Sequence, residues 1–177
     1  MFKNVIGHIK TILIHKYWVF IYACKLGIPW QGFVHDLSKF SFIEFSESVK
    51  FYSGFESPIT RCKRVNGYSF AWQHHKGRNP HHFEYWIDSN GSPINMPSKY
   101  KLEMLADYLA AGKTYMKKEF SYESEFKWYI NRVVVENINI HPETNDFMLK
   151  ALSLLCDGAK NNNMRRAYNL IKKASHD

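Results

Sequence analysis

The stretch Lys101-Leu-Glu-Met-Leu-Ala-Asp-Tyr-Leu-Ala110 carries the clearest structural signal in the chain. Its apolar residues recur at positions i, i+3, i+4 and i+7, and they are Leu102, Leu105, Ala106 and Leu109. This spacing places them on one face of an α-helix. The segment follows Pro97, a residue that suits the start of a helix. It therefore predicts an amphipathic helix that packs against a core and carries Asp107.

The remaining segments also have helical rather than alternating periodicity. From about Lys3 to Leu26 the apolar residues are spaced as in a helix, and Gly27 with Pro29 beyond it is a stop signal. Further helices are expected over residues 33–39, 41–52, 59–75, 122–138, 143–155 and 164–174. No repeat or low-complexity linker divides the 177 residues. The sequence predicts an all-α, single-domain bundle of about seven or eight helices.

Composition excludes several classes of protein. The chain is 45% hydrophobic and 16% aromatic, enough for a sizeable core and against general disorder. Cys24, Cys62 and Cys156 lie far apart, so a disulfide framework or thiolate zinc site is not expected. The most apolar run, Tyr17–Cys24, is far shorter than the roughly 20 residues that cross a bilayer. Without a recognisable secretory cleavage site, the chain is expected to be cytoplasmic and not attached to a membrane.

The formal net charge of +8 favours anionic partners. The basic segments read mainly as solvated helix faces, and no sheet, zinc-finger or helix-turn-helix motif for nucleic acid is present. A phosphorylated small molecule is therefore the preferred partner and nucleic acid a weaker alternative. A homo-oligomer stays open.

The metal-ligand types stand in a suggestive order. His35 and Asp36 are adjacent in His-Asp-Leu-Ser-Lys, after a helix that bears His15 and before the helix that bears Asp107. Imidazole and carboxylate groups suit divalent transition ions such as Mn, Fe, Co and Zn. Adjacent positions on a helix point about 100° apart, so His35 and Asp36 can face one ion. A buried polar network of the same four residues is the competing interpretation, and a metal site is favoured.

At these residues the chain resembles the HD-domain superfamily, helical proteins that mostly hydrolyse phosphate esters. His15, His35, Asp36 and Asp107 match its ligand order over about residues 8–112, although Ser38 stands where the family has Gly. The resemblance implies one HD-type domain over residues 1–177, with helices of residues 121–175 packing on the metal-site core. The motifs HDLSK and NPHHFEYW, the latter at residues 79–86, look like a narrower uncharacterised bacterial and phage family, so no substrate carries over.

A second group of histidines follows the first. His75, His81 and His82 flank a Gly/Pro loop, as in two-metal members of the superfamily, while His74 is the weaker member of its pair. Neighbouring aromatic residues suggest that this segment packs inward, where an unpaired imidazole is costly. The alternative is a set of surface histidines on a loop. We expect one or two ions, with Asp36 as the bridge between them if there are two.

The remaining polar residues receive roles around this centre. Lys39 is expected to contact a phosphate and assist catalysis, and Arg78 and Asn79 to bind substrate. Glu84 is expected either to orient His81 or His82 or to act as a general base. Two further residues are expected to be solvated, Glu103 on its helix face and His8 near its helix start.

The leading hypothesis is a metal-dependent phosphohydrolase acting on a nucleotide or a related phosphate ester or phosphodiester. A di-iron oxygenase of the same fold is one alternative, because such enzymes use the same ligand types. A non-enzymatic helical domain that binds nucleic acid or protein through its basic helices is the other.

Overall fold

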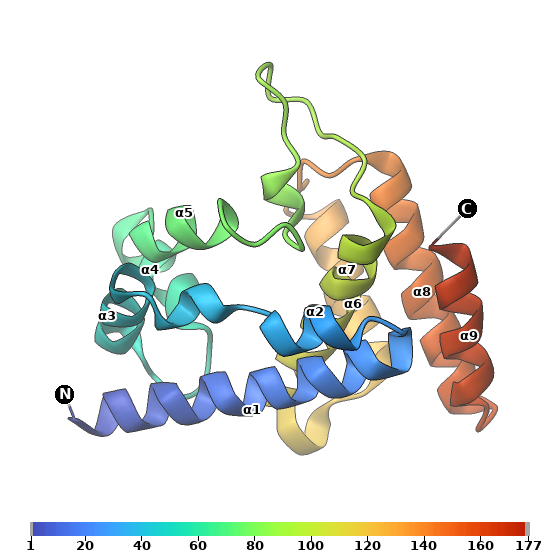
Figure 1. The fold of residues 1–177 in the computed structure, drawn as a ribbon, viewed down its shortest axis with the longest axis horizontal. Coiled ribbons are helices and arrows are strands. Elements are labelled where there is room, and N and C mark those ends of the chain that lie inside the picture. The colour runs from blue at the N-terminus through green and yellow to red at the C-terminus, as the bar shows by residue number, and fades with distance from the viewer. Residues whose placement is uncertain (1, 176–177) are drawn as a thin grey trace.

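Helices account for the structure of the chain, as the periodicity predicts. The computed structural model describes residues 2–175, and within this range there are nine α-helices, three short 3-10 helices and no strand (Figure 1). The α-helices are α1 (Phe2–Leu26), α2 (Pro29–Val34), α3 (Phe42–Phe51), α4 (Pro58–Asn66), α5 (Phe70–Lys76), α6 (Ser98–Met116), α7 (Tyr122–Val134), α8 (Pro142–Lys160) and α9 (Met164–Ala174). The 3-10 helices are η1 (Leu37–Phe40), η2 (Phe83–Tyr85) and η3 (Lys117–Glu119).

The two helices α1 and α6 form the support of the fold. They pack along each other, and α6 is buried on most of its surface, with Leu105, Ala106 and Leu109 fully inaccessible to solvent. From α1, Val19, Tyr22 and Leu26 enter the same core. Because both helices are held by this core, residues at their centres have fixed positions relative to each other.

The helix α2 lies against the second half of α1, and a glycine makes this possible. A Cβ at Gly32 would lie 2.5 Å from the Ala23 Cβ and 3.1 Å from the Phe20 Cα, so no larger residue fits this crossing without a shift. The close approach brings the chain after α2 over the middle of α1. That is where His35 and Asp36 follow.

The expected helix over residues 33–39 is wrong. The α2 helix ends at Val34, His35 is extended, and Asp36 has a φ of 55°, in the left-handed region that Asp tolerates better than most residues. The Lys16 ammonium donates to the backbone carbonyls of Phe33 and His35, and this interaction takes up carbonyls at the helix end. The His-Asp pair thus sits on a sharp bend between α2 and η1.

The expected helix over residues 59–75 divides into α4 and α5, which raises the helix count to nine. Gly67 ends α4 with a φ of 80°, a conformation that glycine adopts without steric cost. Ser69 then caps α5 by accepting from the Trp72 N–H. The Glu47 carboxylate on α3 also accepts from the backbone N–H groups of Phe70 and Ala71. These polar interactions start a new helix in a new direction.

The C-terminal helices complete the core. The helix α8 packs against α7 and α9 and also touches α6, and its Met148, Leu152 and Leu155 are fully buried. One hydrophobic cluster joins residues of α1, α6, α7, α8 and α9. The sequence-based helix over 122–138 ends earlier, at Val134, and the helix over 143–155 continues to Lys160. Within residues 2–175, none of the helices has the length and apolar character needed to cross a bilayer.

Candidate metal centre

One set of possible ligands comes from three elements that are distant in sequence. His15 lies in the middle of α1, Asp107 in the middle of α6, and His35 and Asp36 on the bend after α2. The Nε2 atom of His15 is 3.0 Å from Asp107 Oδ1, and that of His35 is 3.2 Å from Asp36 Oδ2. Ligands about 2.0–2.2 Å from one ion lie about this far apart. The first predicted ligand set is therefore assembled around one point.

A second set shares Asp36 with the first. His75, at the end of α5, places Nε2 3.3 Å from Asp36 Oδ1, and His81 places Nε2 3.4 Å from the same oxygen. His82 completes a group whose ligand atoms all lie within 4.8 Å of one another. The two oxygens of Asp36 thus point to different histidines, Oδ2 to the first set and Oδ1 to the second.

Several of the buried atoms that face these two points have no hydrogen-bond partner among the described residues. They are Asp36 Oδ1 and Nε2 of four histidines, His15, His35, His81 and His82, while Asp36 Oδ2 lies beside the Lys39 ammonium. Leaving a buried polar atom unpaired costs about 1–3 kcal/mol, more for a charged group. Convergence of so many such atoms suits a positively charged ligand better than a hydrogen-bonded network. The buried cluster could therefore hold a metal.

Two buried glutamates fix the orientation of the imidazoles. Glu103 Oε1 lies 2.9 Å from Nδ1 of His35 and 3.1 Å from Nδ1 of His81. On α3, Glu44 Oε2 lies 2.7 Å from Nδ1 of His75. A carboxylate that accepts from Nδ1–H leaves the lone pair on Nε2, the usual arrangement behind a metal-bound histidine. Each Nε2 here faces Asp36.

Electrostatics favours ionised carboxylates and a neutral His15. Burial of His35 is outweighed by the carboxylates around it, which raise the pKa of that imidazole well above its ordinary value, so a bound metal would displace its proton. Burial raises the pKa of Asp36, but the adjacent His35, Lys39 and His75 outweigh it and hold the pKa well below its ordinary value. The pKa of Asp107 is lowered in the same way by His15 and His35. Burial lowers the pKa of His15, with a further contribution from Lys39. Ionised carboxylates and a neutral imidazole are the forms that coordinate metals.

Lys39 lies at the edge of the cluster. Its Nζ is 2.6 Å from Asp36 Oδ2, and the Lys39 side chain keeps 25% of its surface exposed. The Asp107 side chain is 14% exposed, whereas that of His35 is fully buried. Solvent therefore reaches the cluster from the side where Lys39 and Asp107 lie.

The other predicted substrate residues lie in different places. Asn79 is buried, and its side-chain amide donates to Ser38 Oγ and to the His75 carbonyl at 2.8 Å each, so it holds η1 and α5 together. Arg78 is exposed and, with Asn79, lines a pocket whose wall also includes His35 and Asp36. Neither the Asn79 nor the Arg78 side chain forms a hydrogen bond with the candidate ligand atoms that converge on Asp36.

The expected role of Glu84 in orienting His81 or His82 is not what the structure shows. Within residues 2–175, Glu84 Oε2 has no hydrogen-bond partner, and burial raises the pKa of this carboxyl. The carboxylate that supports His81 is Glu103. The expected solvated position of Glu103 was therefore wrong: only 6% of the residue is exposed. Placed four residues before Asp107, it shares the same helix face.

Two further differences concern α1 and α3. His8, expected to be exposed, is 4% exposed and packs against Phe45 and Tyr52. Glu44 was not singled out from the sequence, yet it accepts from Nδ1 of both His74 and His75. No spacing rule links Glu44 to the histidines, because only the packing of α3 on α5 brings them together.

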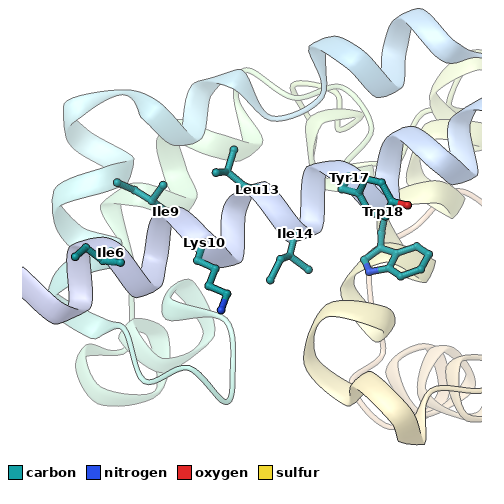
Figure 2. A pocket seen from close by; sticks show the side chains of 7 residues that line it. All are labelled: Ile6, Ile9, Lys10, Leu13, Ile14, Tyr17 and Trp18. Carbon is teal, nitrogen blue, oxygen red and sulfur yellow. The ribbon is translucent and has the colours of Figure 1, made fainter.

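An apolar groove lies elsewhere on the surface. It follows the outer face of α1, has a volume of about 620 Å³, and is lined by Ile6, Ile9, Lys10, Leu13, Ile14, Tyr17 and Trp18 (Figure 2). These side chains are apolar apart from Lys10 and the polar tips of the two aromatic rings. The groove therefore has none of the ligand chemistry of the cluster around Asp36.

Comparison with known proteins places the chain in a family without assigning an activity. No curated protein and no solved structure matches it. One family does match, over residues 4–154, which include all seven of the predicted metal ligands and both supporting glutamates. The chain therefore belongs to the family of unknown function DUF5662.

Proposed function

We propose that the chain is a metal-dependent phosphohydrolase acting on a nucleotide or related phosphate ester. The observation that carries the proposal is the convergence of unpartnered, buried nitrogen and oxygen atoms on the two oxygens of Asp36. One ion would be held by His15, His35, Asp36 and Asp107, and a second by Asp36, His75, His81 and His82. The similarity of this ligand order to the HD-domain pattern supports the same interpretation.

The bound ions supply Lewis acidity, which polarises a phosphoryl oxygen and lowers the pKa of a nearby water. The residues of the chain do the rest. Asp36 and Asp107 supply negative charge that offsets the charge of the ions. Glu44 and Glu103 prevent rotation of the imidazoles, because each accepts from an Nδ1–H. A rigid ligand set holds its geometry while the substrate reacts.

Lys39 gives the proposal its substrate class. Its ammonium lies beside Asp36 on the exposed side of the cluster, so a group that approaches the ions from this side meets a cation. A flexible lysine acts as a point charge toward phosphate oxygens. The net charge of +8 also favours an anionic substrate. Phosphate esters fit both features better than neutral substrates do.

The first test is metal content. Protein prepared without added metal and then loaded with Mn, Fe, Co or Zn should hold about two equivalents by elemental analysis. Asp36→Asn should retain well under one equivalent, because Asn lacks the negative charge that the two sets share. Asn tolerates the left-handed backbone conformation of Asp36, so the variant should still fold. His75→Ala should retain about one, since it belongs to a single set. Full metal retention in folded Asp36→Asn would refute the site.

The second test is turnover. Metal-loaded protein should release phosphate from at least one compound in a panel of nucleotides and phosphodiesters, and a chelator should stop the reaction. Lys39→Ala should raise KM about tenfold or more with unchanged metal content, because Lys39 contacts substrate in this proposal. Lys101→Ala, a lysine of α6 outside the cluster, is the matched control. Metal-loaded, folded protein without hydrolytic activity on the panel would contradict the assignment.

A further inference from the structure

A second cavity lies on the other side of two metal-site histidines. It has a volume of about 280 Å³ and lies between α2, the loop after α5 and the first turn of α6. Its rim includes the exposed residues Trp30, Arg78 and Lys99, and its inner wall includes Glu103 and three of the predicted ligand residues, His35, Asp36 and His81. The proposed reaction gives no role to the rim residues.

The rings of His35 and His81 separate the cavity from the metal-facing atoms. Both rings turn Nε2 toward Asp36 and Nδ1 toward Glu103. Nε2 and Nδ1 point to opposite sides of an imidazole, so Glu103 lies behind the rings as seen from the ions. The two side chains are at most 2% exposed. Asp36 also lines the cavity, but its carboxylate oxygens and Nε2 of both histidines are inaccessible to solvent, so a molecule in the cavity does not reach these atoms.

The cavity presents three kinds of recognition group. Arg78 and Lys99 supply positive charge, and Lys99 stands in the first turn of α6, where the helix dipole also favours an anion. Trp30 and Tyr100 supply aromatic surfaces. The Glu103 side chain is 8% exposed, and its Oε1 accepts from both histidines, whereas Oε2 has no hydrogen-bond partner among the described residues. Oε2 is free to accept from a ligand.

We propose that this cavity binds a nucleoside monophosphate at a site distinct from the metal centre. The phosphate lies between Arg78 and Lys99, the base packs on Trp30, and an N–H edge of the base donates to Glu103 Oε2. A volume of about 280 Å³ is near the lower end for small-molecule sites, about 300–1,000 Å³, and suits one nucleotide rather than a dinucleotide. Because Glu103 also holds His35 and His81, such a ligand contacts the support of the metal centre directly.

Calorimetric titration of the chelator-treated protein with guanosine monophosphate tests the proposal, because guanine has two neighbouring N–H donors on one edge. Trp30→Leu and Arg78→Ala should each weaken binding about tenfold or more, the order expected when a stacking or charged contact is lost. Phe42→Leu and Lys101→Ala remove an exposed aromatic and a lysine that do not line the cavity, and both should bind normally. Inorganic phosphate alone should bind at least tenfold more weakly.

Lys39→Ala distinguishes the two sites, because Lys39 belongs only to the metal face. The proposal requires this variant to bind guanosine monophosphate like the unmodified chain, whether or not the protein hydrolyses any phosphate ester. Loss of binding in Lys39→Ala with retention in Trp30→Leu would place the nucleotide at the metal face and overturn the proposal. Absence of binding at millimolar nucleotide would overturn it as well, and neither result bears on the metal-content test.

Discussion

At the scale of single residues, the carboxylates that support the candidate ligands are as informative as those that could bind an ion. Glu103 supports one histidine from each ligand set, since Oε1 accepts from Nδ1 of His35 and of His81. Glu44 supports only His75 among the predicted ligands. The two glutamates therefore differ in how many ligands depend on them, although both are buried.

This difference predicts unequal effects of two substitutions. Glu103→Ala should lower the affinity for both ions, each by about 10–100-fold, the usual cost of losing a carboxylate that orients a ligating histidine. Glu44→Ala should weaken only the ion held by His75, leaving about one equivalent bound tightly. Metal titration with a competing chelator measures both. Equal effects of the two substitutions would show that Glu103 does not support both sets.

The sequence indicates seven candidate ligand residues, and the structure brings all seven together, but the sequence does not indicate the glutamates that support them. His15, His35, Asp36 and Asp107 were found because a known ligand order names them. Glu103 had a detectable signal, since it lies one turn before Asp107, yet an acid on a helix is usually solvated. Glu44 had none, because its contact with His75 depends on how α3 packs against α5.

At the scale of elements, the approach of α2 to α1 sets the position of the His-Asp bend. Gly32→Ala should disturb this approach, because the added Cβ would meet the Ala23 Cβ at 2.5 Å and backbone at 3.1 Å. We expect a loss of about 1–3 kcal/mol of stability, the usual cost of overpacking, together with reduced metal content although no ligand is altered.

Gly77→Ala is the matched control for this change. Gly77 has a φ of −76°, and a Cβ there would meet its nearest neighbour at 3.4 Å, an ordinary contact. Both glycines lie close in sequence to a candidate ligand, since Gly77 follows His75 by two residues and Gly32 precedes His35 by three. Normal metal content in folded Gly32→Ala would show that the α1–α2 crossing does not position the bend.

The errors in predicting helices have a common physical origin. The long helices α1 and α6 were found because their apolar periodicity extends over many turns. The helix expected over 33–39 failed because Lys16, on another helix, binds the carbonyls where α2 ends. The helix expected over 59–75 is divided because Gly67 ends α4 and Ser69, two residues later, caps the start of α5. Short elements depend on such side-chain contacts, which periodicity does not detect.

At the scale of the whole molecule, the buried acidic side chains differ in whether a basic group lies opposite them. Around Asp36 the buried acids face histidines and Lys39. Glu125, on α7, is 3% exposed and lies over Gly112 of α6, where a side chain would contact its Oε2. Burial, with a contribution from Asp107, raises the pKa of Glu125 from its ordinary value of 4.5 to about 7. This carboxyl is thus a buried acid that folding favours in its protonated form.

The raised pKa predicts a direction for the dependence of stability on pH. Between pH 4.5 and about 7 the folded chain holds a proton on Glu125 that the unfolded chain has released, so this contribution to stability is complete below pH 4.5 and is lost by pH 7. A shift of this size corresponds to roughly 3 kcal/mol at most.

Glu125→Gln keeps the shape of the side chain and cannot ionise. Urea unfolding of chelator-treated protein should therefore measure the free energy of unfolding of both proteins at pH 5 and at pH 8. The variant's free energy of unfolding, relative to that of the unmodified chain, should be roughly 2–3 kcal/mol more favourable at pH 8 than at pH 5. The difference between the two proteins isolates Glu125, because all other titrating groups are shared. If both proteins lose stability equally between pH 5 and pH 8, then Glu125 is ionised in the folded chain and α7 packs on α6 with that charge accommodated.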